Sequence, residues 1–376
     1  MNRIIAFFCL LVLFCFTGTG CWDLKDVSET AFVTGIALDL ADSEDNPRYK
    51  VTLAIPSPLA IKNRSTAEYT DFFTAEAESI TKALQKLQAE LPRSLSFHHL
   101  RAVFFGEKLA SNHDFRDSFS YFSKNPEIAL RMRIFFIQGE EAQDFLKNRP
   151  QFERSIIGEL VSLTQSGKQL ALTRTNRYAN FSWDLQNNEG TALGSRVMSS
   201  KDAEKKKTIR DGGAVFKDWK LIGWLSGEET QGANWLLDRP VFYVEGKIKG
   251  GLYTYLTDNK TVKINPIKIG DQIQFNVELK TNGLVIEEKE VDIDFSNPKN
   301  ISELESVLSQ EIKKQLEDAV YKSQKVFAAD YLGFGKAFKD KYPKDFKKIE
   351  DWNRVYPEVL IHVKVTAKIS RFGKAE

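Results

Sequence analysis

The sequence lacks an excess of charge of either sign. Its 376 residues include 53 Lys and Arg against 51 Asp and Glu, which gives a formal net charge of +2 at pH 7. A protein that binds nucleic acid gathers a basic excess on one face, because it must neutralise phosphates. We therefore expect no nucleic-acid partner for this chain.

Cysteine and histidine are also scarce. The three cysteines are Cys9, Cys15 and Cys21, and the four histidines include the neighbours His98 and His99. Adjacent residues on a strand point to opposite faces, so these two histidines could not ligate one metal ion together. We interpret His99 as a buried or hydrogen-bonded side chain that enters a strand, and we expect no metal site.

Sequence motifs of catalysis are missing as well. The chain has no P-loop and no G-x-S-x-G nucleophile elbow. The segment Gly333-Phe334-Gly335 looks like half of a dinucleotide fingerprint, but it lacks the third glycine and follows a helical pattern. We expect Gly333 to end that helix in a left-handed conformation, with Phe334 packing back on it. The sequence thus favours a binding or scaffolding role over an enzyme.

Long hydrophobic runs are limited to the N-terminus. Residues 4–16 form an unbroken apolar run of 13 residues, with Arg3 before it and Thr-Gly-Thr-Gly after it. A transmembrane helix needs about 20 apolar residues, so this run is too short to span a membrane comfortably. A charged start, a short apolar centre and a small-residue exit are typical of a secretory signal. We therefore predict a signal peptide at residues 1–20.

Cys21 would then be the first residue of the mature chain. The other two cysteines lie in the predicted signal, so Cys21 would have no partner for an internal disulfide. A lone thiol at this place resembles the lipobox of bacterial lipoproteins, in which the sulfur receives a diacylglycerol and the chain is cut before the cysteine. Thr19 and Gly20 match that pattern, and Gly20 marks the cut, whereas Gly18 stands where Leu is usual. The alternative is an uncleaved signal anchor.

Apolar periodicity in the first half of the chain predicts a mixed α/β or α+β fold of several domains. The 27 phenylalanines favour an aromatic-rich core over an exposed apolar surface. The strand-like segments are residues 31–40, 49–55, 101–106 and 128–138. The helical segments are residues 74–91, 114–123, 140–147 and 152–165.

The composition changes near residue 200. Residues 199–210 are almost all polar or charged, which is typical of a linker or of an exposed hairpin tip, and we place a charged linker at 201–211. It would separate an N-terminal α/β domain at 21–200, with room for two subdomains, from a C-terminal α/β domain at 212–372.

The second domain should contain a hairpin at 214–226, strands up to residue 293 with a type I′ turn at Asn282-Gly283, and a final strand at 359–369. The longest helix is predicted over 301–329, started by a capping box of Asn300 and Glu303. Its single apolar stripe should pack across a sheet.

Four stretches together resemble the Ger(x)C family, the C subunits of bacterial spore germinant receptors. They are GCWD at 20–23, SFHHLRAVFFGEKLA at 96–110, GGAVFKDWKLIGWLS at 212–226, and DYLGFGKAF with the later DWNRVYPEVLIHVKVTAKISRFG. The order and spacing of these stretches carry the resemblance, which covers essentially the whole mature chain. The candidate interface or structural residues in them are Trp22, Asp23, His99, Gly333, Phe334, Gly335 and Trp352.

The resemblance implies a lipoprotein at the outer face of the spore inner membrane, with a mixed α/β fold of about three small subdomains. It implies two integral membrane partners, the A and B subunits, with which the chain would sense nutrients that trigger germination. It implies no enzymatic activity and no cofactor beyond a covalent diacylglycerol, and an N-acyl chain, on Cys21. The rival hypothesis is a solute-capturing lipoprotein that binds a small molecule in a cleft between residues 21–200 and 212–372.

Overall fold

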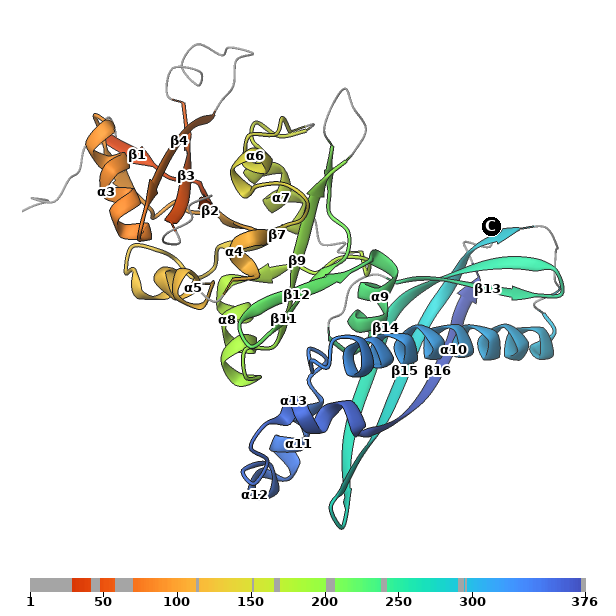
Figure 1. The fold of residues 1–376 in the computed structure, drawn as a ribbon. Helices are drawn as coiled ribbons and strands as arrows, with labels where there is room; N and C mark the ends of the chain where they lie inside the picture. The colour runs from red at the N-terminus through yellow and green to blue at the C-terminus, as the bar shows by residue number, and fades with distance from the viewer. Residues whose placement is uncertain are drawn as a thin grey trace, which may run out of the picture.

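The computed structural model describes residues 29–41, 48–57, 70–112, 115–150, 152–165, 170–200, 207–237, 242–289, 294 and 296–372. Gly20, Cys21, Trp22 and Asp23 lie outside these residues. The described part contains mixed sheets, packed helices and a long C-terminal helix (Figure 1). The predicted fold class is therefore confirmed.

The first large element is a mixed sheet, which has ten strands among the described residues. Its order is β12-β11-β9-β7-β6-β2-β3-β4, with β8 paired to β7 and β10 paired to β9. The central strands β2, β6, β7 and β9 run parallel, and the outer strands are antiparallel. The strands are β2 (Gly35–Ala41), β3 (Arg48–Pro56), β4 (Thr70–Ala77), β6 (Ala102–Gly106), β7 (Arg133–Ile137), β8 (Asn176–Arg177), β9 (Ala192–Ser199), β10 (Thr208–Ile209), β11 (Gly213–Lys217) and β12 (Lys220–Leu225). A separate parallel pair joins β1 (Thr30–Phe32) to β5 (Ser94–Ser96).

Successive strand residues point to opposite faces, so the apolar strands of this large sheet give it two apolar faces. Helices cover both of them. Phe105 and Phe136 belong to the core on one face, and their neighbours Phe104 and Phe135 belong to the core on the other. The first core is closed by α3 (Ile80–Glu90), α4 (Glu107–Ala110), α5 (Phe115–Lys124) and α8 (Tyr178–Asn187). The second is closed by α6 (Ala142–Leu146) and α7 (Ile156–Gln165).

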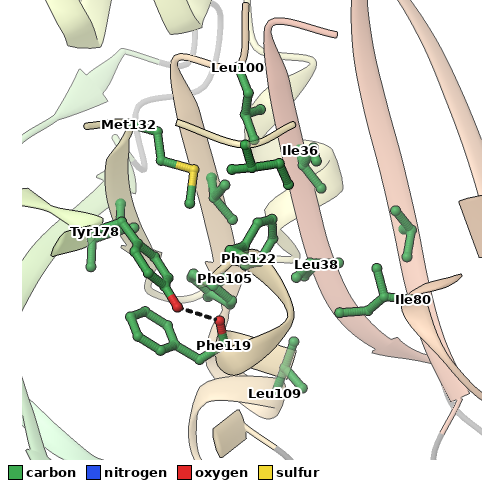
Figure 2. Close-up of a cluster of buried hydrophobic side chains, with 14 of the residues drawn as sticks. Ile36, Leu38, Ile80, Leu100, Phe105, Leu109, Phe119, Phe122, Met132 and Tyr178 are labelled. Atoms are coloured by element: carbon green, nitrogen blue, oxygen red, sulfur yellow. Dashed lines mark hydrogen bonds between the residues drawn. The ribbon is translucent and has the colours of Figure 1, made fainter. Parts of the chain in front are cut away.

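The first core is rich in aromatic rings, as the phenylalanine content predicts. Figure 2 shows Phe105, Phe119 and Phe122 packed beside Met132 and Tyr178. The Tyr178 hydroxyl donates a hydrogen bond of 2.8 Å to the carbonyl of Phe119, so the polar end of this buried ring has a partner. The aromatic core is confirmed.

The second sheet lies in the C-terminal half and has four strands among the described residues, in the order β13-β14-β15-β16. They are β13 (Tyr243–Ile248), β14 (Gly251–Ile269), β15 (Gln272–Lys289) and β16 (Leu360–Phe372). The helix α10 (Pro298–Tyr321) crosses one face of this sheet (Figure 1). Its stripe of Leu304, Leu308, Ile312 and Leu316 is fully buried against the sheet, as predicted.

Two predictions for this half are wrong. Asn282-Gly283 forms no turn, since both residues pair with β14 inside β15, and the turn lies at Gly270, where φ is +60°. A Cβ on Gly283 would lie 2.2 Å from the carbonyl oxygen of Leu256, so close strand approach explains this glycine. The long helix is capped by Asn297, whose side chain accepts from the backbone N–H of Lys299, and not by Asn300.

Element boundaries also differ in the first half. The predicted helix at 74–91 begins only at Ile80, after the Ser79 side chain accepts from the backbone N–H of Lys82; residues 74–77 belong to β4. The predicted strand at 128–138 begins only at Arg133. In both cases the apolar pattern runs continuously across the boundary, so periodicity alone could not place it.

The hairpin β11–β12 connects the two halves. It follows the charged segment in the sequence, yet β11 pairs with β9 and so completes the large sheet. The next helix, α9 (Gly227–Leu237), lies between the two sheets and contacts both β12 and α10 (Figure 1). Within the described residues, the helices are all too short or too polar to cross a membrane.

Candidate functional site

His99 does not enter a strand. It lies in the turn before β6, and both His98 and His99 are exposed. The His99 ring packs edge-on against Phe32, with ring centroids 4.9 Å apart. The prediction that His99 is buried as it enters a strand is therefore wrong. The turn breaks the extended backbone that this interpretation assumed.

The other candidates within the described residues converge on one buried carboxylate. Asp330 is 3% exposed and accepts hydrogen bonds from the backbone N–H groups of Gly333, Phe334 and Gly335. A fourth bond comes from the indole Nε1 of Trp352, at 2.8 Å. Burial raises the pKa of the Asp330 carboxyl, and the four donated hydrogen bonds oppose that rise. Every partner is a donor, so the site suits the ionised carboxylate.

This carboxylate fixes the start of α11 (Phe334–Lys341). Gly333 has φ of +88°, but it precedes α11 and does not end the long helix, so its predicted role as a helix C-cap is wrong. Gly335 lets the helix approach Trp352 closely, because a Cβ there would lie 2.5 Å from the indole nitrogen. Phe334 packs on Phe275, with ring centroids 5.1 Å apart. The motif thus positions α11 against the C-terminal sheet.

α11 faces α8 of the first half across two adjoining hollows. Their volumes are about 280 Å³ and about 670 Å³, and both are lined by Trp183, Asn188 and Lys336. We call them together the interdomain cleft. Asp330 lines the smaller hollow, so the buried carboxylate lies at its wall.

The lining of the interdomain cleft is mostly polar. The Lys336 ammonium lies 4.5 Å from the centroid of the Trp183 ring, which joins α11 to α8 through a cation–π contact. Burial raises the pKa of Glu189, and the Asp351 carboxylate adds to the rise. Such a cleft can hold a small polar solute through its hydrogen-bonding groups.

Below the cleft, a buried amide ties the halves together. Asn234 on α9 is fully buried and donates to the carbonyls of Ala171 and Thr173, at 2.7 and 3.0 Å. Its amide oxygen accepts from Arg174, and Lys260 donates to its backbone carbonyl. The amide is fully satisfied, so this contact favours one fixed arrangement of the two halves.

Sequence reasoning missed Trp183, Lys336 and Asn234. Trp183 and Lys336 meet only through the fold, and neither carries a local signal. Asp330 precedes Gly333 by three residues, a spacing that could have identified the carboxylate as an acceptor for the following N–H groups. The described residues contain no cluster of His, Cys, Asp and Glu suited to a metal ion.

Comparisons with known proteins match both halves of the chain. Residues 23–195 match the spore germination protein N-terminal domain, and residues 211–373 match the spore germination B3/GerAC-like C-terminal domain. This chain belongs to the GerAC-like spore germination family. It is the family that the four stretches resemble, so the recognition is confirmed.

Relatives of the GerAC-like family match over almost the whole length. Spore germination protein B3 of Bacillus subtilis (strain 168) is 24% identical over 384 residues, covering 98% of this chain and 97% of the relative. Spore germination protein KC of the same organism is 24% identical, covering 94% of this chain and 92% of the relative. The crystal structure of the GerBC protein matches with a TM-score of 0.60 and 19% identity, covering 93% of this chain and 100% of that chain. The last match shows the shared fold.

Proposed function

We propose that this GerAC-like chain is the lipid-anchored, non-enzymatic C subunit of a spore nutrient germinant receptor. It would be tethered through a diacylglycerol on Cys21 at the outer face of the spore inner membrane, after cleavage at Gly20. There it would assemble with the integral membrane A and B subunits and help to trigger germination. Two or three acyl chains suffice for stable attachment, whereas one chain would be marginal.

The observation that carries this proposal is the order of the two family matches. The N-terminal match begins at residue 23, two residues after Cys21, and the C-terminal match ends at residue 373. The predicted signal peptide therefore lies outside the matched region. A tether at Cys21 would keep both halves near the membrane, which raises their effective concentration for assembly with membrane subunits.

The test replaces the proposed lipid acceptor in the full chain. Spores that carry Cys21→Ala should lose the protein from the membrane fraction, germinate more slowly with nutrient, and yield less A and B subunit on co-purification. Cys15→Ala is the matched control, because it removes a cysteine from the predicted signal and keeps the acceptor. Unchanged fractionation of Cys21→Ala would refute the tether. Loss of Cys21→Ala from the membrane fraction together with normal germination would refute the role of the tether in receptor function.

The alternative, capture of a small solute, is favoured by the hollow interdomain cleft. Lys336→Ala would remove the cation that lines both hollows, and Lys344→Ala on α12 (Pro343–Phe346) is an exposed control outside the cleft. Solute capture predicts that Lys336→Ala raises the nutrient concentration for half-maximal germination and that Lys344→Ala does not. Equal nutrient responses of both variants and the parent chain would reject this alternative.

A further inference from the structure

A further cavity lies where the parallel strands β6 and β7 of the large sheet begin. Its volume is about 850 Å³. Arg133 is the first residue of β7, and Arg101 directly precedes β6. We call this the arginine cavity. The charged and titratable residues that line it are Arg101, Arg131, Arg133, Arg177, His98 and His99.

Backbone pairing brings these cations together. Arg133 and Arg177 are directly opposite partners in the β7–β8 ladder. The backbone N–H of Arg133 also donates to the carbonyl of Arg101, at 2.8 Å. Like charges directly opposite each other destabilise a sheet, so this arrangement costs free energy in the absence of a counter-charge.

The described part of the chain supplies no counter-charge. None of its acidic residues lines the cavity, and none forms an ion pair with Arg101, Arg131, Arg133 or Arg177. Burial lowers the pKa of the Arg133 guanidinium, and Arg177 lowers it further. Burial lowers the pKa of the Arg210 guanidinium, and the nearby positive charge of Arg133 lowers it further. The Arg210 Nη1 atom is buried and has no hydrogen-bond partner among the described residues.

Guanidinium groups present several N–H donors in a planar fork, which matches the oxygens of a phosphate. A phosphate would neutralise the repulsion and satisfy several donors at once. The cavity volume falls within the range of about 300–1,000 Å³ for small-molecule sites, so it has room for more than the phosphate itself. Phe32, Met132 and Val161 give the remaining lining an apolar part.

We propose that the arginine cavity binds the phosphate group of an organic phosphate, with Arg133 and Arg177 as its principal donors. Two sources share this chemistry, the headgroup of an anionic phospholipid and a soluble phosphorylated solute. The proposed function makes the lipid source reachable, since Phe32 is eleven residues after Cys21 and such a segment spans at most about 40 Å. The cavity itself stands independently of the tether.

The test uses the full chain purified in an uncharged detergent, at an ionic strength held constant with sodium chloride. Calorimetric titration with inorganic phosphate probes the soluble source, and titration with dihexanoyl phosphatidylglycerol probes the lipid source. We expect saturable binding of at least one probe. Arg133→Gln and Arg177→Gln should each weaken it about tenfold or more, since each removes hydrogen bonds to a charged group.

Arg354→Gln is the matched control, because it removes the same charge from a side chain that is 87% exposed and bonded to Asp351. Melting curves followed by circular dichroism check that each variant folds. If Arg133→Gln does not fold, the variant Arg131→Gln, at an exposed position, takes its place. Tighter binding of the lipid identifies a headgroup site, and tighter binding of phosphate identifies a soluble ligand. Absence of saturable binding for both probes, or equal weakening by Arg354→Gln, would overturn the proposal. None of these outcomes depends on tethering or germination.

Discussion

Replacing Gly335 by Ala should destabilise the C-terminal half through a single added methyl group. The Cβ would lie 2.5 Å from Nε1 and 2.7 Å from Cδ1 of Trp352. These distances are too short for non-bonded atoms, so the indole or the start of α11 has to shift. Either shift lengthens the bond between the indole and the Asp330 carboxylate, which is 2.8 Å long in the native structure.

The expected cost combines three contributions. Forcing a methyl group into a packed site costs about 1–3 kcal/mol. Loss of a hydrogen bond to a buried charged group costs about 1.5–3 kcal/mol. The better helix propensity of alanine returns about 1 kcal/mol at most. We therefore expect Gly335→Ala to lower the free energy of unfolding by about 2–5 kcal/mol.

Urea unfolding followed by tryptophan fluorescence measures this change. Gly158→Ala is the matched control within α7, because its Cβ would meet its nearest neighbour, the Ser155 hydroxyl, at 3.3 Å. In a Trp352→Phe background, which lacks the clashing indole nitrogen, Gly335→Ala should cost much less, as a double-mutant cycle would show. A change below about 0.5 kcal/mol for Gly335→Ala, or an equal cost in both backgrounds, would refute the reasoning.

Two further predictions concern the large sheet. Burial raises the pKa of Asp39 to about 6, above its unfolded value, so the folded protein holds this proton more tightly than the unfolded chain does. The free energy of unfolding should therefore fall by about 3 kcal/mol as pH rises from about 4 to about 6. Asp39→Asn should flatten this part of the pH profile in urea unfolding, and an unchanged profile would contradict the assignment. Phe136→Ala, at a fully buried site, should cost about 3–5 kcal/mol, whereas Phe152→Ala, 91% exposed, should leave the melting temperature unchanged. Equal effects of the two would argue against the aromatic core as a source of stability.

The sequence predicts regular elements well where one face is buried. The stripe of α10 repeats every four residues from Leu304, and its packing against a sheet follows from that pattern alone. The turn prediction at Asn282-Gly283 is wrong because the local turn preference competes with strand pairing on both sides of β15, to β14 and to β16. Pairing prevails there, and the glycine instead permits the close approach of Leu256.

The candidate site is only partly predictable for a related reason. Gly333, Gly335 and Trp352 stand out as a motif, and their shared partner Asp330 lies within five residues of both glycines. The arginine cavity, by contrast, collects residues from six separate segments between 32 and 177. No spacing in the sequence links these segments, since the parallel strand order brings their ends together only after folding.

The hairpin β11–β12 has a consequence for any cleavage of the chain between residues 200 and 207. After such a cut, β11 would still be hydrogen-bonded to β9, and Phe216 would still pack against Phe136 and Phe181. The two fragments would migrate as one species on a native gel and separate only under denaturing electrophoresis. Conversely, expression of residues 212–372 alone would uncover the Phe216 side of the hairpin and give an aggregation-prone product.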